Sequence, residues 1–319
     1  MSVRELLVEE FRRSGPIPFE RFMEISLYAP GCGYYTAPAD PFGKAGDFYT
    51  AEQLQPVFGR LIAQYARARF AEMGEPSDFR FVEIGAGRRE LAEFLEQWNY
   101  VGVDAGEEFP SGISGVVFAN EFFDALPVHL AVKRAGGFVE QYVSESRQLV
   151  DGPAVSGRLQ AYLDRYHPDA PEGSIVEVNL RALDWICRIA ASMRIGLFVI
   201  IDYGYTAREW VRHSQGTLMS YRRHRASEDV LSNPGEADIT SHVAWTTLED
   251  AAMAAGWQRV SFESLASFLL RAGQADEFAS ALAASDEREA THHRLQLKTL
   301  LFGMGETFRV LTLRRNEQK

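Results

Sequence analysis

The sequence predicts an α/β protein in which helices cover a mostly parallel sheet. Apolar strand patterns alternate with helical patterns from about residue 78 to the C-terminus. One strand pattern, at 80–83, runs into the turn Gly85-Ala86-Gly87, and a second, at 100–103, ends in Asp104. Strand, glycine turn, helix and strand in this order form a βαβ unit, and parallel sheets are built from such units.

A helical extension is expected before the sheet. Residues 2–13 have the apolar spacing of an amphipathic helix, and further helical patterns lie at 18–28 and 51–73. Between the last two lies a long segment, 31–50, that is rich in glycine, proline and aromatic residues. A loop of this length inside a compact chain is usually functional, so we expect it to cover a ligand.

The remaining elements belong to the predicted core. Strands are expected at 80–83, 100–103, 115–119, 137–142, 174–178, 196–201, 258–262 and 306–314. Helices are expected at 87–97, 158–165, 179–193 and 246–255. We therefore divide the chain into an extension over 1–75 and a core over 76–319, with a helical insertion at 263–303.

The composition is that of a soluble globular protein. The chain is 46% hydrophobic and 24% charged, with a net charge of -11. The acidic balance disfavours nucleic acid as a partner, and no apolar stretch is long enough for membrane insertion. Cys32 and Cys187 show no paired spacing, so neither a metal site nor a disulfide framework is expected. The acidic residues of the N-terminal helix are unlike a targeting segment, and a cytoplasmic location is expected.

The glycine turn is the first candidate binding feature. Gly85 and Gly87 allow a ligand close to the backbone, Glu83 ends the preceding strand, and the Asp104 carboxylate can accept both hydroxyls of a ribose. Glu90 stands where a dinucleotide fingerprint has its third glycine, which favours S-adenosylmethionine (SAM) over a dinucleotide. The alternatives are an ordinary strand-to-helix turn and a capping role for Asp104.

A second candidate feature follows the strand at 115–119. Asn120 and Glu121 stand at the strand end, with Asp124 three residues after Glu121. Two carboxylates at this spacing can share one face and hold a cationic or N–H-bearing nucleophile. Phe122 and Phe123 are interpreted as core residues.

A third strand end carries Asp202 and Tyr203, a carboxylate and a phenol that suit a polar substrate. The alternative for Asp202 is a turn cap. Downstream, Tyr221 and His224 are candidate substrate contacts, while the arginines around His224 are interpreted as a solvated surface. Because ligands bind at the carboxyl ends of parallel strands, we expect these motifs to face one cleft.

Taken together, these stretches resemble the MidA/NDUFAF7 family of SAM-dependent methyltransferases, whose mitochondrial members are arginine methyltransferases needed for assembly of respiratory complex I. The matching segments occur in order along nearly the whole chain: 15–35, 46–65, 82–91, 119–129, 200–205, 218–224, 234–243 and 302–311.

The resemblance implies a Rossmann-like, seven-stranded methyltransferase core with the N-terminal helical extension and the C-terminal helical insertion. It also implies the residues that bind SAM: Gly46, Asp47, Phe48, Thr50, Glu83, Gly85, Gly87, Asp104, Asn120 and Glu121. Three departures are visible. Ala86 replaces a proline of the family pattern, Arg89-Glu90 replaces Gly-Thr, and the segment after Asp104 is shortened.

The sequence therefore predicts a SAM-dependent methyltransferase that acts on a protein side chain, with arginine favoured. Glu121 is the first candidate for orienting the nucleophile, and Asp124 or Asp202 the second. Three alternatives stay open: a small-molecule O- or N-methyltransferase, a SAM-binding assembly factor without catalysis, and a nicotinamide-dependent oxidoreductase.

Overall fold

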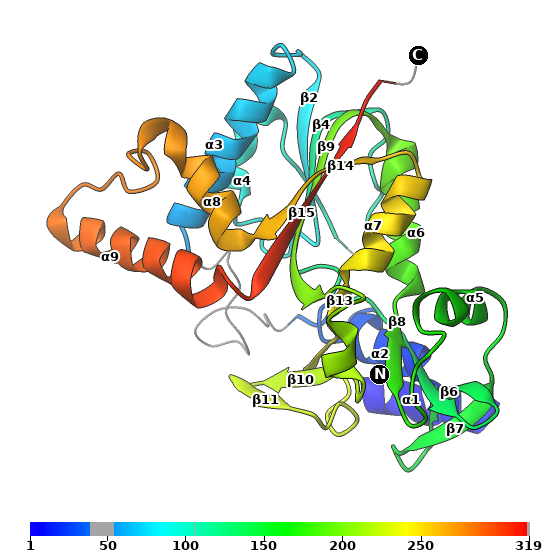
Figure 1. Ribbon diagram of the computed structural model, residues 1–319. Helices are drawn as coiled ribbons and strands as arrows, with labels where there is room; N and C mark the ends of the chain where they lie inside the picture. Colours follow the sequence, from blue (N-terminus) through cyan, green and yellow to red (C-terminus); the bar gives the residue numbers. More distant parts are fainter. Residues whose placement is uncertain (39–53, 105, 318–319) are drawn as a thin grey trace. The chain divides into compact units, whose positions relative to one another are not determined.

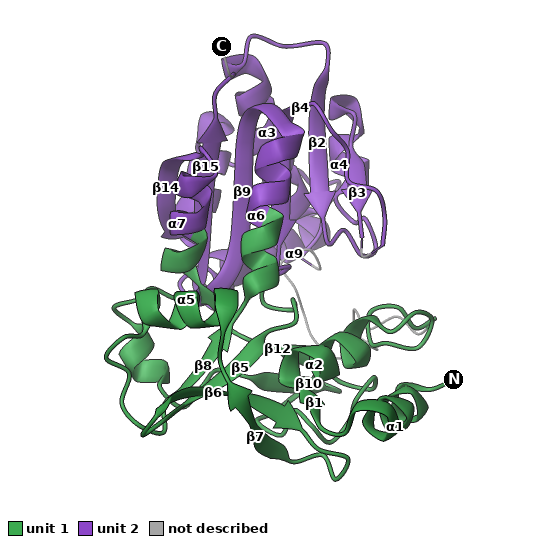
Figure 2. Ribbon diagram, turned by 90° about the vertical axis from the view of Figure 1, so that its right-hand side faces the viewer, with its two compact units in different colours: residues 1–49, 124–185, 205–248 green, residues 50–123, 186–204, 249–319 purple. Residues whose placement is uncertain are grey.

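The computed structural model describes residues 1–38, 54–104 and 106–317 (Figure 1). The chain forms two compact units, each built from separate segments (Figure 2). Unit 1 contains residues 1–49, 124–185 and 205–248, and unit 2 contains 50–123, 186–204 and 249–319. The division into an extension over 1–75 and a core over 76–319 stays a prediction.

Unit 2 contains the predicted parallel sheet. Its strands are ordered β3 (Val101–Val103), β2 (Phe79–Ile84), β4 (Ile113–Asn120), β9 (Met193–Tyr205), β15 (Phe308–Arg315) and β14 (Gln258–Ser264). The first four run parallel, and β15 is antiparallel to both of its neighbours. Within the described residues this path holds six strands of a seven-stranded sheet, and β13 (Val243–Ala244) lies off it.

Helices pack on this sheet through a large apolar core. α3 (Val57–Glu72) and α8 (Leu265–Gly273) contribute Phe58 and Phe268, which are fully buried with Phe81 and Phe118 of the sheet. The central strands β4 and β9 are mostly apolar and buried, as expected for a sheet covered by helices. The other helices that reach into unit 2 are α4 (Ala92–Leu95), α6 (Leu180–Ser192), α7 (Trp245–Ala254) and α9 (Glu287–Lys298).

Two predicted helical regions are shorter than expected. The helix at 87–97 is reduced to α4 and the 3-10 turn η2 (Glu96–Trp98), because Gly87 and Arg89 have positive φ and cannot start an α-helix. In the insertion at 263–303, a non-helical stretch separates η4 (Gln274–Asp276) from α9, which continues into the π-helical turn η5 (Thr299–Met304).

Unit 1 contains a second, antiparallel sheet. Its strands are β1 (Ile17–Pro18), β6 (Gly137–Val143), β5 (His129–Arg134) and β8 (Ile175–Val178), with β7 (Leu149–Ala154) beside β6. The strands predicted at 137–142 and 174–178 are therefore real but do not belong to the parallel core. The intervening helix α5 (Gly157–Tyr166) makes this stretch look like a parallel crossover, whereas β6 and β8 both pair antiparallel with β5.

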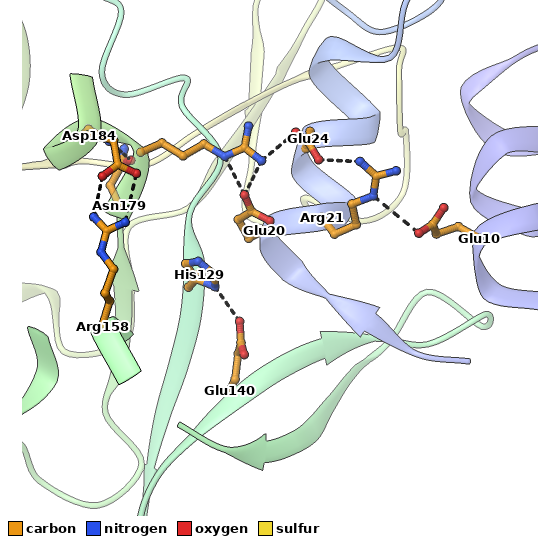
Figure 3. Close-up of polar contacts among 11 residues, drawn as sticks. Glu10, Glu20, Arg21, Glu24, His129, Glu140, Arg158, Asn179 and Asp184 are labelled. Atoms are coloured by element: carbon orange, nitrogen blue, oxygen red, sulfur yellow. Dashed lines mark hydrogen bonds and ion pairs between the residues drawn. The ribbon is translucent and has the colours of Figure 1, made fainter. Parts of the chain in front are cut away.

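Helices α1 (Val3–Ser14) and α2 (Phe19–Tyr28) belong to unit 1, with α1 started by a capping box between Ser2 and Glu5. An ion-pair network fixes α2 (Figure 3). Arg181, at the start of α6, donates to Glu20 and to Glu24 at 2.7 Å, and Arg21 pairs with Glu24 and Glu10. Burial alone would raise the pKa of Glu24, but the hydrogen bonds from Arg181 and Arg21 outweigh it and lower that pKa.

Unit 1 also holds a small sheet of β10 (Met219–Arg222), β11 (Arg225–Ser227) and β12 (Asp238–Thr240), and the 3-10 turn η3 (Trp210–His213). The sequence did not predict these strands or β7: β10, β11 and β12 are only three or four residues long, and β7 and β11 are also too exposed to show an apolar alternation. Within the described ranges, no helix is both long and apolar enough to cross a membrane.

Candidate functional site

The glycine turn after β2 is built as the sequence predicts. Gly85 and Gly87 have φ values of +71° and +47°, in the left-handed region that glycine adopts without strain. The Gly85 amide donates to the Val103 carbonyl at 2.9 Å, and the Gly87 amide donates to Asp104 Oδ1 at 3.1 Å. The turn is therefore held against the end of β3, and Asp104 is half-buried beside it.

Asp104 has the environment of a binding carboxylate. Burial raises its pKa above the ordinary value, and the hydrogen bond from Gly87 only partly offsets this effect. Its second oxygen, Oδ2, has no hydrogen-bond partner among the described residues. A half-buried carboxylate with an available oxygen at a strand end can accept hydroxyl donors from a ligand.

Arg89 holds the loop after Asp104. Its guanidinium contacts both oxygens of Glu107, at 2.9 and 3.1 Å, and Glu107 Oε2 accepts the Asp104 amide at 2.8 Å. Arg89 has a φ of +56°, and it stands where the family pattern has glycine. The backbone therefore keeps a glycine-like conformation, while one guanidinium nitrogen of the side chain bridges the two carboxylate oxygens of Glu107 in the shortened segment.

Glu83 lies beneath the turn rather than on its surface. Its side chain is 1% exposed, and Oε2 accepts a hydrogen bond from the Tyr100 hydroxyl at 2.5 Å. A carboxylate this deeply buried and bonded within the sheet supports the turn from below. Tyr100 was not among the predicted site residues, because nothing in the sequence pairs a tyrosine just before β3 with the end of β2.

The end of β4 carries a carboxylate residue, Glu121, whose backbone is strained. Glu121 has a φ of +50°, and its amide donates to the Ile201 carbonyl at 2.9 Å, which continues the ladder between β4 and β9. Asn120 Nδ2 donates to Glu121 Oε1 at 3.3 Å, while Asn120 Oδ1 is buried without a hydrogen-bond partner in the described part of the chain. A non-glycine residue in this region is uncommon, and such strain clusters at functional sites.

Asp202 braces the turn that carries Glu121. It is fully buried, and its Oδ2 and Oδ1 accept the backbone amides of Phe123 and Tyr203 at 3.0 and 2.9 Å. These contacts match the turn-capping alternative, so Asp202 acts on the site through the backbone. The Tyr203 ring packs edge-on against the Phe308 ring, with the ring centres 5.5 Å apart.

Phe122 brings the two strand ends together. A Cβ built on Gly85 would lie 2.8 Å from Phe122 Cδ2, so the glycine is required for this approach. Phe122 is half-buried, whereas Phe123 is buried in the core. Phe123 is therefore a core residue, as predicted, whereas Phe122 lies against the glycine turn at the candidate site.

Asp124 belongs to unit 1, where it lies near a group of phenols. Tyr28 donates to the Ala125 carbonyl at 3.0 Å, and the Tyr35 hydroxyl donates to Asp238 Oδ1 at 2.8 Å. Burial raises the pKa of Tyr35 well above its ordinary value, and the charges of Asp238 and Asp124 add to this effect. Burial also raises the pKa of Tyr221, and the charges of Asp124 and Asp238 add to this effect.

The remaining predicted residues are placed as follows. His224 is exposed in the turn between β10 and β11. Gly46, Asp47, Phe48 and Thr50 lie outside the described residues, so their role stays a prediction. In the described ranges, no group of three or more His, Cys, Asp or Glu residues could hold a metal ion.

Comparisons with known proteins identify the class. Residues 91–263 match the model of a family described as "Putative S-adenosyl-L-methionine-dependent methyltransferase". A crystal structure of a Burkholderia thailandensis protein bound to S-adenosyl-homocysteine superposes with a TM-score of 0.87, at 31% identity over 99% of this chain and 92% of that one. A native crystal structure of a protein from the same organism superposes with a TM-score of 0.81, at 29% identity over 99% of this chain and 92% of that one. The fold is therefore that of a SAM-dependent methyltransferase.

The chain belongs to this methyltransferase family. Among curated relatives, the mitochondrial "Protein arginine methyltransferase NDUFAF7 homolog" of Drosophila melanogaster is 26% identical, over 76% of this chain and 68% of that one. The corresponding Xenopus tropicalis protein is 26% identical, over 74% and 67%. The predicted resemblance is thus confirmed. The predicted cytoplasmic location is contradicted, because these relatives are named as mitochondrial proteins, and an acidic N-terminal helix does not decide location.

The described residues fit SAM as the cofactor. Two observations support the fit: the available oxygen of Asp104 beside the glycine turn, and the buried, unpartnered Oδ1 of Asn120 at the next strand end. The first suits ribose hydroxyls and the second a donor on the ligand. The absence of a third glycine is consistent with a cofactor that has no pyrophosphate to bind.

Proposed function

We propose that this methyltransferase modifies a nitrogen atom of a protein side chain, with arginine as the favoured residue. The observation that carries the proposal is the conformation of Glu121, a carboxylate held at a strand end in a strained backbone conformation beside Asn120. The names of the relatives, which are protein arginine methyltransferases, support the choice of substrate.

In the proposed site, Gly85, Gly87, Asp104 and Asn120 hold the cofactor. When bound, SAM supplies an electrophilic methyl group on its sulfonium sulfur. Asp104 would accept hydroxyl hydrogen bonds through Oδ2, and the glycine turn would admit the ligand close to the backbone.

Glu121 would orient the nucleophile. A guanidinium is charged at all physiological pH values and is a poor nucleophile, so one of its nitrogens must be positioned and its charge balanced. The Glu121 carboxylate can accept two N–H bonds from the guanidinium, and Asn120 Nδ2 fixes Oε1 for this purpose. Because Asp202 and the Ile201 carbonyl lock the turn, the carboxylate is preorganised before the substrate arrives.

A variant series tests the role of Glu121. SAM affinity is measured by calorimetry, and methyl transfer by mass spectrometry of candidate protein substrates. We expect Glu121→Gln to keep SAM affinity within about threefold and to lose methyl transfer by roughly 100-fold, the scale of one preorganised contact. Glu93→Gln, an exposed change on α4, is the matched control and should retain activity.

Glu121→Gly separates chemistry from bracing. Glycine tolerates a φ of +50°, so this variant should fold at least as stably as the parent, with a gain of up to ~1 kcal/mol, and should be inactive. A clear loss of thermal stability would instead assign Glu121 a structural role. Absence of SAM binding by the parent protein would reject the proposal altogether, and SAM binding without any methylated product would favour the assembly-factor alternative.

A further inference from the structure

A second candidate binding site lies in unit 1, in a cleft of about 490 Å³ at the hairpin of β10 and β11. Its lining residues are Ser220, Arg222, Arg223, Arg225, Ser227, Asp229 and Asn233. Three guanidinium groups and one carboxylate therefore face a cleft of a size typical for small ligands. This is unusual in a chain with a net charge of -11.

The hairpin is locally unfavourable in two respects. Arg223 and His224 form its two-residue turn with φ values of +50° and +59°, a conformation for which hairpins normally use glycine or asparagine. Arg222 and Arg225 are directly paired across the strands, and like charges in that position repel. A segment that combines a strained turn with opposed like charges is better explained by function than by stability.

The charges are arranged so that a cationic group remains available. Arg222 is fixed by Asn233 Oδ1 at 3.1 Å and by Glu236 Oε2 at 2.7 Å. Asp229 turns its oxygens to its own loop, where it accepts from the Leu231 amide and the Ser232 hydroxyl. The Arg225 side chain is exposed and makes no ion pair or hydrogen bond within the described residues.

From these contacts we infer that the cleft binds carboxylate groups of an acidic segment in a partner protein. Guanidinium groups pair with carboxylates in bidentate fashion, and Ser227 and Asn233 offer further hydrogen bonds. A nucleic acid would need an extended basic surface, which the overall negative charge disfavours. The inference rests on the proposed function to the extent that the partner is the protein substrate.

Fluorescence anisotropy with a labelled peptide of alternating glycine and glutamate tests the site at low salt. The peptide should bind the parent protein, and the same peptide with glutamine should not. The double variant Arg223→Gln/Arg225→Gln should weaken binding at least tenfold, whereas Arg67→Gln, an exposed change on α3, should leave it unchanged. If the double variant fails to fold, Arg225→Gln alone gives the same comparison without touching the turn.

Several outcomes would overturn the inference: no binding of the glutamate peptide, equal binding by the double variant, or equal loss in Arg67→Gln. Tighter, Arg225-dependent binding of a single-stranded oligonucleotide or of phosphatidylserine vesicles would also reject an acidic protein segment. SAM calorimetry on the same samples separates the two proposals. Arg225-dependent peptide binding without SAM binding would support the cleft and reject the proposed function, and the reverse result would reject only the cleft.

Discussion

At the scale of single residues, the candidate site is marked by backbone conformations that are costly for its side chains. Glu121 and Arg89 both have positive φ, at a cost of roughly 1–2 kcal/mol per residue for L-amino acids. The ion pair with Glu107 helps to offset the strain at Arg89. At Glu121, the hydrogen bond from its backbone amide to the Ile201 carbonyl holds the backbone in the strained conformation. The carboxylate is thereby kept in place.

Gly85 provides a first test at this scale. Gly85→Ala adds a Cβ 2.8 Å from Phe122 Cδ2 and forces alanine into a φ of +71°. We expect SAM affinity, measured by calorimetry, to fall at least tenfold because the turn and Phe122 must separate. Gly112→Ala is the matched control, since it has a φ of +63° but nothing within 4 Å of the added Cβ. Equal SAM affinity in the two variants would show that the Gly85 turn does not shape the cofactor site.

Asp104 provides a second test. Asp104→Asn should weaken SAM binding by about 1–3 kcal/mol, the cost of losing hydrogen bonds to a charged group, while Glu93→Gln should not. Because burial raises the pKa of Asp104, the parent should lose affinity as the pH falls through that raised value, and the variant should not share this loss. Calorimetry between pH 7 and pH 5 measures the difference, and parallel curves for parent and variant would contradict the ribose assignment.

The sequence predicted a glycine turn and acidic strand ends, and the structure contains both, while the ligand-binding roles of these residues stay predictions. Gly85, Gly87 and Asp104 are placed as predicted, because glycine and a strand-terminal acid have specific local meaning. Glu83 and Asp202 are candidate ligand contacts in the sequence, with a turn cap as the alternative for Asp202; in the structure both are buried and bonded inside unit 2. One sequence gives no information on whether a carboxylate at a strand end points up to the ligand or down to the backbone.

At the scale of elements, the positions of strands were easier to predict than the sheet to which each belongs. Two of the parallel strands of unit 2, β4 and β9, are long and mostly buried apolar runs, which makes them easy to recognise in the sequence. The antiparallel sheet of unit 1 was missed as a separate sheet. A helix between β6 and β8 produces the same pattern as a crossover, and only pairing with β5 distinguishes them.

The conformation of the turn that follows β4 depends on Asp202. Asp202→Asn leaves one carbonyl oxygen where two backbone amides, of Phe123 and Tyr203, need acceptors. We expect a loss of about 1–3 kcal/mol in the free energy of unfolding, together with a lower rate of methyl transfer as the Glu121 turn loosens. Asp184→Asn, which affects only an exposed pair with Arg158, serves as the control in the same denaturant titrations. A stable Asp202→Asn protein with unchanged SAM binding and no turnover would instead give Asp202 a direct role in the chemistry.

At the scale of the whole molecule, both units bury titratable side chains. In unit 2 the buried carboxylates Glu83 and Asp202 accept hydrogen bonds at strand ends. Unit 1 buries histidines as well: His167 lies against Trp210 with ring centres 4.5 Å apart, and His242 lies 5.1 Å from His213. Burial lowers the pKa of both His167 and His242 to about 4, and the charge of His213 adds to the effect on His242.

These histidines predict acid sensitivity. Both are neutral in the folded protein down to about pH 4 but take up a proton near pH 6.5 when the chain unfolds. Since the unfolded state then binds more protons, stability is full above pH 6.5 and is lost as the pH falls toward 4. Each histidine contributes a loss of about 2 kcal/mol by pH 5. Asp104 and Glu177 act in the opposite direction, because burial raises their pKa values and their ionisation costs stability as the pH rises.

His167→Phe isolates the histidine effect. Phenylalanine keeps a ring against Tyr162 and Trp210, removes the titrating group and removes a buried Nδ1 that has no partner in the described ranges. Denaturant titrations at pH 7 and pH 5 should show that the variant loses about 2 kcal/mol less than the parent over this interval, because one imidazole no longer has to be kept neutral. His292→Phe, an exposed change on α9, should keep the pH dependence of the parent. If His167→Phe also keeps it, the acid sensitivity of the molecule arises elsewhere than at His167.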